Sequence, residues 1–415
     1  MHRHTGTSPK VRRRWTRYLH FFFLLACCAA HQGACIQAVA AQTLLLDRNT
    51  HKCVQGRMCI CLDLSFEAKR CPGEDHQCCD SSANMSDLSR TVPQEQLPSQ
   101  DLCLSPTPVI NLGHLSLDSV TRSHVVNDIT KACRDLGYFQ VINHGISQSV
   151  MDCAVKAASD FFQLPSEIKE EFASEDFRQP VRYDTSSKDG ISMSRAFLKH
   201  YAHPLSDWIQ YWPQQPPIYR EYMGKYAVEA RRVALQLIEA ILEGLGLGKE
   251  YLNEKFQEGS QLLSVNCYPK ASQGATTIGL APHSDYGFLT ILLTSCLGLE
   301  VVDRSSNSWR TAQQLPHALN VHLGDHMEVL SNGLIKTVVH RALLNSEEAR
   351  ISIASIHGFA LDEKVTCAKE LVDEQNPQKY KESSFSDFLD HLTANMDNKQ
   401  RNFLESLKTL GSRAE

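Results

Sequence analysis

The hydrophobic pattern of the chain changes from a helical period to a period of two near residue 261, and this change limits the fold more than any other feature. After that point Gly, Asn, Ser and Pro separate a series of short apolar runs. The runs are residues 262–269, 277–283, 288–294, 297–303, 308–312, 318–325, 336–343 and 350–359. Eight short strands with turn residues between them are typical of a double-sheet jelly roll or barrel.

Helical periodicity dominates the residues before this series. We predict helices at about residues 117–135, 147–163 and 218–246, and short strands at 108–112 and 138–145. The longest helix carries an apolar face that should brace the core, formed by Tyr226, Ala230, Val233, Leu237, Ile241 and Leu245. Its charged residues lie elsewhere on the helix and are Arg231, Arg232, Glu239 and Glu243.

Two more helices are predicted at the end of the chain, at about residues 384–393 and 397–409. The fold class is therefore α+β, with a jelly-roll core and flanking α-helices. The boundaries that we expect divide the chain into residues 1–40, 41–103, 104–255, 256–361 and 362–415.

The first hundred residues differ in composition from the rest of the chain. Residues 1–40 join a basic start, an apolar stretch at 18–30 and the small-residue site Ala38-Val39-Ala40, which are the three parts of a secretory signal. An upstream extension of the gene model is the alternative. Residues 41–103 form a segment of unknown role that is rich in cysteines, at Cys53, Cys59, Cys61, Cys71, Cys78, Cys79 and Cys103.

Composition excludes several classes of protein. Of the 415 residues, 42% are hydrophobic and 21% are charged, which argues against wholesale disorder. The net charge is −5, whereas a general nucleic-acid binder carries a basic surplus, so we expect no nucleic-acid partner. No run reaches the roughly 18 apolar residues of a membrane span, so we expect no stable span either.

Two histidines and one carboxylate stand in the β region. His283-Ser284-Asp285 follows one β run, and His340 lies inside another. The His-x-Asp spacing puts two side chains on one face of a strand, because side chains alternate with a period of two. Two imidazoles and one carboxylate on one face of a metal, with the opposite positions open, suit a non-haem Fe(II) oxygenase.

Two further alternating pairs accompany these residues. Asn266 and Tyr268 lie on the strand before His283, and Arg350 and Ser352 lie on the strand after His340. A lone arginine in an otherwise apolar strand costs several kcal/mol unless it is paired. No acid of this segment is an obvious partner, so a ligand carboxylate is a natural candidate; an Arg350 that reaches outward to solvent is the alternative.

The chain from about residue 107 to 392 resembles the plant family of Fe(II)- and 2-oxoglutarate-dependent dioxygenases. The residues that carry the resemblance are ACRDLGYFQVINHGIS (132–147), FFQLPSEIKEEF (161–172), VNCYP (265–269), GLAPHSDYGFLTILL (279–293), LNVHLGDHMEVLSNGLIKTVVHRAL (319–343) and RISIASIHGF (350–359). In that family a helical N-terminal region packs on a distorted double-stranded β-helix, and the iron lies in the mouth of the β core.

The resemblance implies a role for each candidate residue. His283, Asp285 and His340 are similar to the iron ligands, and Arg350 with Ser352 to the pair that binds the distal carboxylate of 2-oxoglutarate. Two further residues also match that site, with Tyr268 as a hydrogen-bond donor and Asn266 near the metal-bound end of the cosubstrate. The implied cofactors are Fe(II) and 2-oxoglutarate, with ascorbate as the expected reductant.

The implied reaction is the hydroxylation or desaturation of a small plant metabolite with O2, which releases succinate and CO2. An ascorbate-dependent oxidase of the same fold and a non-catalytic small-molecule-binding protein are the alternatives. Flavonoid-oxidising relatives usually carry a Phe where this chain has Ile356, so stacking on a flat phenolic substrate is less assured. Candidate pocket walls are Tyr183, Phe197 and Phe359, and residues 191–204 resemble the substrate-facing region of the family.

The last expectations concern the location of the protein in the cell and its oligomeric state. Members of the family are usually cytosolic, so we expect a cytoplasmic enzyme, with the secretory route as the alternative if the leader is a true signal. We expect a monomer.

Overall fold

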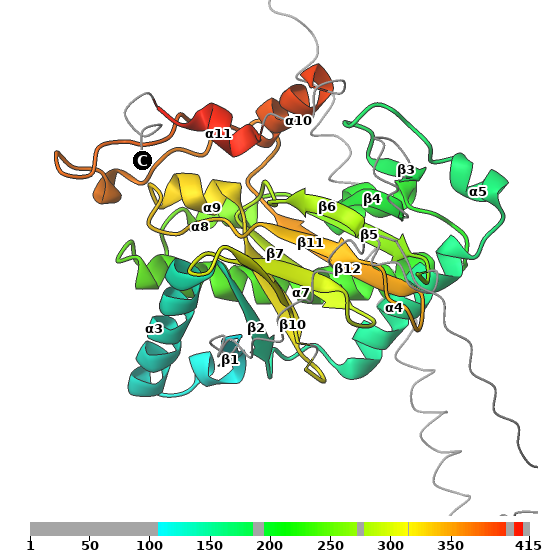
Figure 1. Ribbon diagram of the computed structural model, residues 1–415, viewed down its shortest axis with the longest axis horizontal. Coiled ribbons are helices and arrows are strands. Elements are labelled where there is room, and N and C mark those ends of the chain that lie inside the picture. The colour runs from blue at the N-terminus through cyan, green and yellow to red at the C-terminus, as the bar shows by residue number, and fades with distance from the viewer. Residues whose placement is uncertain (1–106, 186–194, 272–277, 314, 396–401, 410–415) are drawn as a thin grey trace, which may run out of the picture. The chain divides into compact units, whose positions relative to one another are not determined.

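The computed structural model describes residues 107–185, 195–271, 278–313, 315–395 and 402–409, and Figure 1 shows their arrangement. By their internal contacts the residues fall into two units, Met1–Leu97 and Pro98–Glu415, and the described residues all belong to the second. The predicted leader and the cysteine-rich segment lie outside the described residues. Among those described, no helix is both long and apolar enough to cross a membrane.

Two β-sheets form the centre of the described unit (Figure 1). The larger has the order β1-β2-β10-β7-β12-β5-β4-β3 and the smaller the order β6-β11-β8-β9. Their bounds are β1 (Val109–Asn111), β2 (Tyr138–Ile142), β3 (Val181–Thr185), β4 (Ala196–His203), β5 (Gln261–Tyr268), β6 (Ile278–His283), β7 (Leu289–Thr294), β8 (Leu299–Asp303), β9 (Ser308–Thr311), β10 (Leu319–Leu323), β11 (His340–Leu343) and β12 (Arg350–His357). Each of the eight predicted runs overlaps one strand, from β5 to β12, so the jelly-roll prediction is confirmed.

One of these strands is shorter than its apolar run suggested. We predicted a strand at 336–343, but β11 begins only at His340. In the preceding residues the backbone N–H of Thr337 donates to the side chain of Glu328 at 2.7 Å, and the Thr337 hydroxyl donates to the Leu323 carbonyl at 3.1 Å. These side-chain bonds replace part of a regular strand ladder.

Strands β3 and β4 were not predicted. They extend the larger sheet, since β4 pairs antiparallel with β5 and β3 pairs with β4. In this register Phe197 lies opposite Asn266 and Lys199 lies opposite Ser264. The segment that sequence resemblance marked as substrate-facing is therefore joined directly to a strand that carries two candidate site residues.

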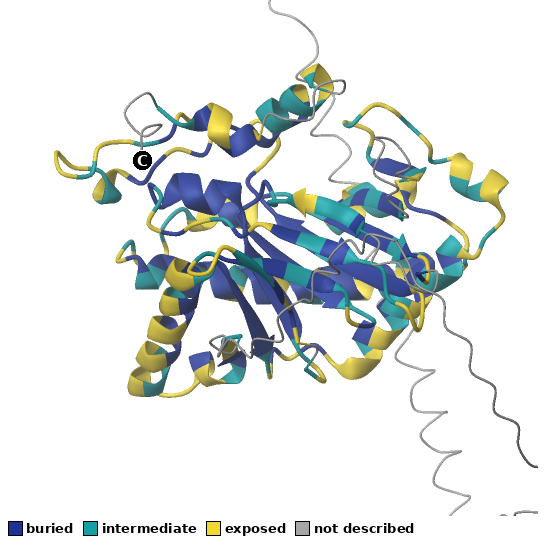
Figure 2. Cartoon of the chain, viewed as in Figure 1, coloured by how far each residue is buried: buried dark blue, intermediate teal, exposed yellow. Residues whose placement is uncertain are grey.

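Helices α3 (Ser119–Asp135), α4 (Gln148–Phe162) and α7 (Tyr219–Gly244) confirm the three long helices that were predicted. Helix α7 contacts β7 and β12, and α4 contacts β5 and β12, so both cover one face of the larger sheet. Figure 2 shows the buried residues gathered in the sheets and on the inner sides of these helices. The packing of these two helices thus supports the strands that carry the site.

Arg231 of α7 is a correction, because it was expected away from the apolar face. It is 7% exposed, and its Nη2 donates to the carbonyl oxygens of Phe256 and Gln257 at 2.8 and 3.0 Å. These carbonyls lie in the last turn of α8 (Asn253–Gln257), where backbone acceptors are left over and a cation is favourable.

The remaining helices are short. They are α5 (Ser166–Glu170), α6 (Leu205–Trp208), α9 (Asp325–Leu330), α10 (Phe385–Ala394) and α11 (Phe403–Leu407), with 3-10 turns at Leu112–Ser116, Ile209–Tyr211 and Lys369–Leu371. Helix α9 was not predicted, and α10 was. Of the helix expected at 397–409, the described part is α11, and residues 397–401 lie outside the described residues.

Candidate active site

The two sheets bring His283, Asp285 and His340 together. His283 ends β6, His340 begins β11, and the two residues are direct partners across this antiparallel pair. Asp285 follows two residues after β6, and its Oδ1 lies 3.8 Å from His283 Nε2 and 3.9 Å from His340 Nε2. One ligand atom from each residue lies within 4.8 Å of the others, which is the spacing of a metal-binding cluster.

Backbone carbonyls fix the orientation of both imidazoles. His283 Nδ1 lies 2.9 Å from the Ala281 carbonyl, and His340 Nδ1 lies 3.3 Å from the Val338 carbonyl. A carbonyl oxygen only accepts hydrogen bonds, so in each ring Nδ1 carries the hydrogen and Nε2 keeps its lone pair. Both lone-pair nitrogens face Asp285, as a metal ligand requires.

The protonation states of these residues also suit metal binding. Burial lowers the pKa of His283 and that of His340, so both imidazoles are neutral, which is the ligating form. Asp285 Oδ2 is buried and has no hydrogen-bond partner among the described residues. A carboxylate with a buried, unpartnered oxygen between two neutral imidazoles fits a divalent cation such as Fe(II).

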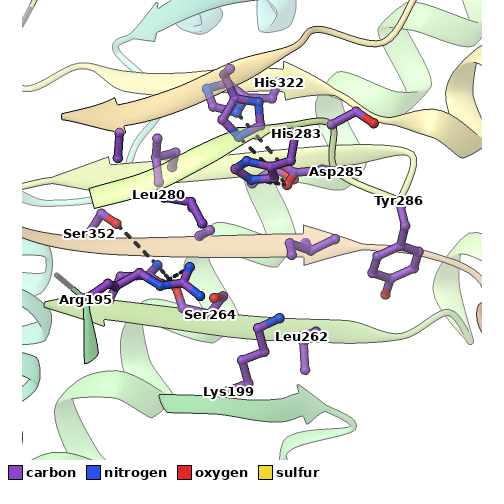
Figure 3. Close-up of a pocket in the computed structure, with 18 of the residues that line it drawn as sticks. Arg195, Lys199, Leu262, Ser264, Leu280, His283, Asp285, Tyr286, His322 and Ser352 are labelled. Atoms are coloured by element: carbon purple, nitrogen blue, oxygen red, sulfur yellow. Dashed lines mark hydrogen bonds and ion pairs between the residues drawn. The ribbon is translucent and has the colours of Figure 1, made fainter. Parts of the chain in front are cut away.

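The sequence reasoning missed His322, which also faces this cluster (Figure 3). It is 1% exposed, its ring centroid lies 4.3 Å from that of His340, and its Nδ1 lies 3.8 Å from Asp285 Oδ2. Neither ring nitrogen has a hydrogen-bond partner among the described residues. The available signal was a lone histidine inside the apolar run of β10.

Arg350 lies in the same cavity as the cluster. It is the first residue of β12 and is 2% exposed, so the outward-reaching alternative is wrong. Its Nε donates to the Cys296 carbonyl at 3.2 Å, and its guanidinium lies 5.1 Å from the centre of the Tyr268 ring. Among the described residues no carboxylate forms an ion pair with Arg350, and burial lowers its pKa.

The other three predicted residues surround this arginine. Across the β12–β5 pair Arg350 lies opposite Tyr268, and Ser352 lies opposite Asn266. Asn266 Nδ2 donates to Ser352 Oγ at 3.3 Å, and Asn266 Oδ1 accepts from Arg195 Nη1 at 3.2 Å. The structure therefore places all seven predicted site residues along one cavity of about 240 Å³.

Five aromatic side chains also line this cavity, and we call them the aromatic wall. It is formed by Phe177, Tyr201, Tyr286, Phe385 and Phe388. The Tyr286 ring stacks on that of Phe385, with centroids 4.2 Å apart and an 8° angle between the planes.

The aromatic residues that we expected as pocket walls are not part of this wall. None of Tyr183, Phe197 and Phe359 lines the cavity, whereas Ile356 does. Tyr183 and Phe359 pack in the main hydrophobic core instead.

Comparison with known proteins agrees with this geometry. Residues 107–217 match the family model of the N-terminal region of a non-haem dioxygenase in morphine synthesis, and residues 259–358 match that of the 2OG-Fe(II) oxygenase superfamily. The chain is 81% identical over 325 residues to flavanone 3-dioxygenase 3 of Oryza sativa subsp. japonica, a match that covers 78% of this chain and 100% of the relative.

One further relative and one solved structure also support a 2-oxoglutarate-dependent dioxygenase. The chain is 62% identical over 304 residues to the chloroplastic 2-oxoglutarate-dependent dioxygenase 21 of Oryza sativa subsp. japonica, covering 73% of this chain and 91% of the relative. Among solved structures, JOX2 in complex with 2OG, Fe and JA has a TM-score of 0.64 and 30% identity, over 74% of this chain and 90% of that one. Fe(II) and 2-oxoglutarate are thus the cofactor and cosubstrate, with ascorbate as the reductant typical of such enzymes.

The resemblance noted in the sequence and the α+β fold are both confirmed by these relatives. The chain belongs to the 2OG-Fe(II) oxygenase superfamily, as a 2-oxoglutarate-dependent dioxygenase that oxidises a small plant metabolite.

Proposed function

We propose that His283, Asp285 and His340 hold Fe(II), and that Arg350 with Ser352 holds the distal carboxylate of 2-oxoglutarate. The observation that carries this assignment is the buried Arg350, which has no carboxylate partner among the described residues and shares one cavity with the three-residue cluster. A guanidinium offers a rigid fork to a carboxylate, and the resulting bond is strong where water is excluded.

Each surrounding side chain has a task in this proposal. The Ala281 and Val338 carbonyls keep the two imidazoles oriented through their Nδ1–H groups. The Tyr268 hydroxyl donates a further hydrogen bond to the cosubstrate. Asn266 lies between Arg195 and Ser352, so it fixes the position of Ser352 and faces the metal-bound end of 2-oxoglutarate.

The bound iron, together with 2-oxoglutarate and O2, supplies the oxidation and releases succinate and CO2. The protein orients the substrate and excludes water, which protects a reactive intermediate from side reactions. The aromatic wall favours a small aromatic metabolite as the substrate, which is either hydroxylated or desaturated. Because the rice relative is called a flavanone 3-dioxygenase, a flavanone is the first compound to test.

The experiment is turnover of a panel of aromatic metabolites, including flavanones, by purified protein with Fe(II), 2-oxoglutarate and ascorbate. Mass spectrometry should find a product that gains one oxygen atom or loses two hydrogen atoms, with one succinate formed for each product. An oxidised product that needs ascorbate but forms no succinate would favour the ascorbate-dependent oxidase. Binding of the metabolites without any product would favour the non-catalytic alternative.

The remaining expectations are also proposals. We propose a monomer that works in the cytoplasm, and the boundaries 104–255, 256–361 and 362–415 for its parts. The secretory route and, because one rice relative is called chloroplastic, the plastid are the alternatives. Fluorescent-protein fusions of the full chain and of a chain beginning at Leu104 would separate them, since only a true leader changes the location.

A further inference from the structure

Three cations meet on the β3–β4 side of the cavity. Arg182, Arg195 and Lys199 all line it, and Arg182 lies directly opposite Lys199 across the β3–β4 pair. Like charges that face each other across two strands destabilise a sheet. The Phe197 ring lies among them, with its centre 5.1 Å from Arg182, 4.7 Å from Arg195 and 5.4 Å from Lys199, and compensates only part of this repulsion.

The three cations differ in their polar partners. Arg182 pairs with Asp184 at 3.9 Å and donates to the Ser174 carbonyl at 3.4 Å. Arg195 donates to Asn266, as described above. Lys199 is half-buried, and within the described part of the chain its amine meets neither a hydrogen-bond acceptor nor an ion-pair partner. Burial, followed by the repulsion of Arg182 and Arg195, lowers the pKa of Lys199 to about 7, and the attraction of the Asp285 carboxylate offsets only part of this shift.

The metal and the cosubstrate do not balance this charge. Fe(II) and Arg350 bring three positive charges, and Asp285 and 2-oxoglutarate bring three negative charges, so these four groups balance one another and leave no negative charge over for Lys199. Among the described residues that line the cavity, Asp285 is the one acidic residue. Asp285 is then engaged by the metal, so Lys199 has no anion of its own after the cofactors have bound, and protonation of its half-buried amine stays costly until an anion pairs with it.

The position of Lys199 indicates what that anion belongs to. In Figure 3 its side chain rises from β4, beside Leu262, toward the side of the cavity where His283 and Asp285 lie. The aromatic wall of Tyr201, Tyr286 and Phe385 lines the same cavity. The volume of about 240 Å³ is below the ~300–1,000 Å³ of typical ligand pockets, which favours a small molecule.

We propose that the substrate is a small aromatic carboxylic acid whose carboxylate binds Lys199, with Arg182 nearby, while its ring packs on the aromatic wall. This inference rests on the proposed function and narrows the class of its substrate. The lysine anchors the acid at one end of the ring, and the opposite end of the ring is left to face the iron ligands. A neutral metabolite of the same size would leave the Lys199 charge without a partner.

The test measures binding to the full chain loaded with Fe(II) and 2-oxoglutarate in the absence of O2. The probes are benzoate, cinnamate and their neutral amides, because each amide keeps the ring and loses the charge. The variants are Lys199→Met, which keeps the length of the side chain, and Lys199→Arg, which keeps the charge. Lys131→Met is the matched control, because Lys131 is exposed on α3, outside the cavity.

We expect at least one acid to bind about 10- to 100-fold more tightly than its amide to the wild type and to Lys131→Met. Lys199→Met should remove this preference, and Lys199→Arg should retain part of it. The 2-oxoglutarate affinity and the melting temperature of Lys199→Met serve as checks that the cavity is still folded. An acid that is oxidised by the wild type should show the same pattern in its KM.

Equal binding of acids and amides to the wild type would overturn the inference, and so would an undiminished preference in Lys199→Met. Succinate formation with a flavanone, unaffected by Lys199→Met, would also overturn it while leaving the proposed function intact. If the loaded protein forms no succinate with any compound and does not bind 2-oxoglutarate, the proposed function itself fails.

Discussion

At the scale of single residues, the unpartnered oxygen of Asp285 is the clearest sign that this cluster binds a cation. The carboxylate is held in a buried position beside three imidazoles, of His283, His322 and His340, and Oδ2 has no hydrogen-bond donor among the described residues. An arrangement that is unfavourable for the protein alone becomes favourable when a metal occupies it.

We therefore expect Asp285→Ala to abolish turnover and to weaken Fe(II) binding strongly, because one of three proposed ligands is lost. The metal-free variant should melt no lower than the metal-free wild type, since the change removes a buried, unpartnered charge. Product formation, metal titration and thermal melting provide the measurements. Full activity at ordinary iron concentrations would show that Asp285 is not a ligand.

At the scale of elements, the turn between β7 and β8 shapes the proposed cosubstrate site. Gly298 in this turn has φ +138°, and a Cβ there would lie 2.7 Å from the Leu343 carbonyl oxygen and 3.0 Å from Arg350 Cδ. The contact of 2.7 Å is shorter than real Cβ atoms show, and the contact of 3.0 Å lies at that limit. The absence of a side chain at Gly298 thus lets the β8 side of the cavity lie against the stem of Arg350.

Gly298→Ala should cost about 1–3 kcal/mol of stability through backbone strain and should also weaken 2-oxoglutarate binding by displacing Arg350. Gly246→Ala is the matched control, because Gly246 also has a positive φ, of +80°, but a Cβ there meets nothing within 4 Å. Urea unfolding and 2-oxoglutarate titration of both variants separate the two effects. Equal 2-oxoglutarate affinities in the two variants would contradict the role of this turn.

The elements also show where sequence reasoning succeeds and where it stops. The strands from β5 to β12 follow from alternation and turn residues, because these signals are local. Strand β4 pairs with β5, which is distant in sequence, and β3 joins the sheet through β4, so no local signal places these two strands beside the site. Helix α9 is only six residues long and is buried throughout, including its polar residues Asp325, His326 and Glu328, so it has no exposed polar face whose period could be read from the sequence.

The residues of the site also divide into those that the sequence predicts and those that only the fold reveals. The seven predicted residues stand in motifs with fixed spacing, and all of them line the cavity. His322 lies within residues 319–343, which carried the resemblance, but no role was attached to it there. Lys199 and Arg182 stand in no such motif, and they reach the cavity because β4 pairs with the distant strand β5. Their contribution is set by the folded geometry and by the charges around them, neither of which a single strand encodes.

At the scale of the whole molecule, buried neutral histidines should make the fold sensitive to acid. His200 of β4 lies between helix α7 and Trp212, with Nε2 2.9 Å from the Tyr219 hydroxyl and its ring 4.2 Å from that of Trp212. Burial lowers the pKa of His200 from 6.5 to about 3. The unfolded chain therefore binds this proton at a higher pH than the folded one, so stability is present above pH 6.5 and is lost as the pH falls toward 3.

From pH 6 to pH 5, His200→Gln should lose ~1 kcal/mol less stability than the wild type, although it is less stable at neutral pH. The reason is that glutamine takes up no proton on unfolding. Urea unfolding of both proteins at pH 7, 6 and 5 provides the comparison. Parallel losses in the two proteins would mean that the fold does not hold His200 neutral.

The central claim for the whole molecule is that one cavity holds iron at one point and the distal carboxylate of 2-oxoglutarate at Arg350. The most direct measurement is the affinity of the iron-loaded protein for 2-oxoglutarate without O2, in the wild type and in Arg350→Gln, Arg350→Lys, Ser352→Ala and Arg341→Gln. Arg341 is the matched control, because it lines the same cavity but already pairs with Glu300 at 2.6 Å and stacks on Trp309.

Loss of one member of a buried ion pair costs ~3–5 kcal/mol, so Arg350→Gln should weaken 2-oxoglutarate binding on the order of 100-fold or more. Arg350→Lys should recover only part of the affinity, since it keeps the charge and loses the two-pronged geometry. Ser352→Ala should cost ~1–3 kcal/mol, and Arg341→Gln should stay near the wild type. If Arg350→Gln binds 2-oxoglutarate as tightly as the wild type does, the arginine is structural and the cosubstrate is anchored elsewhere.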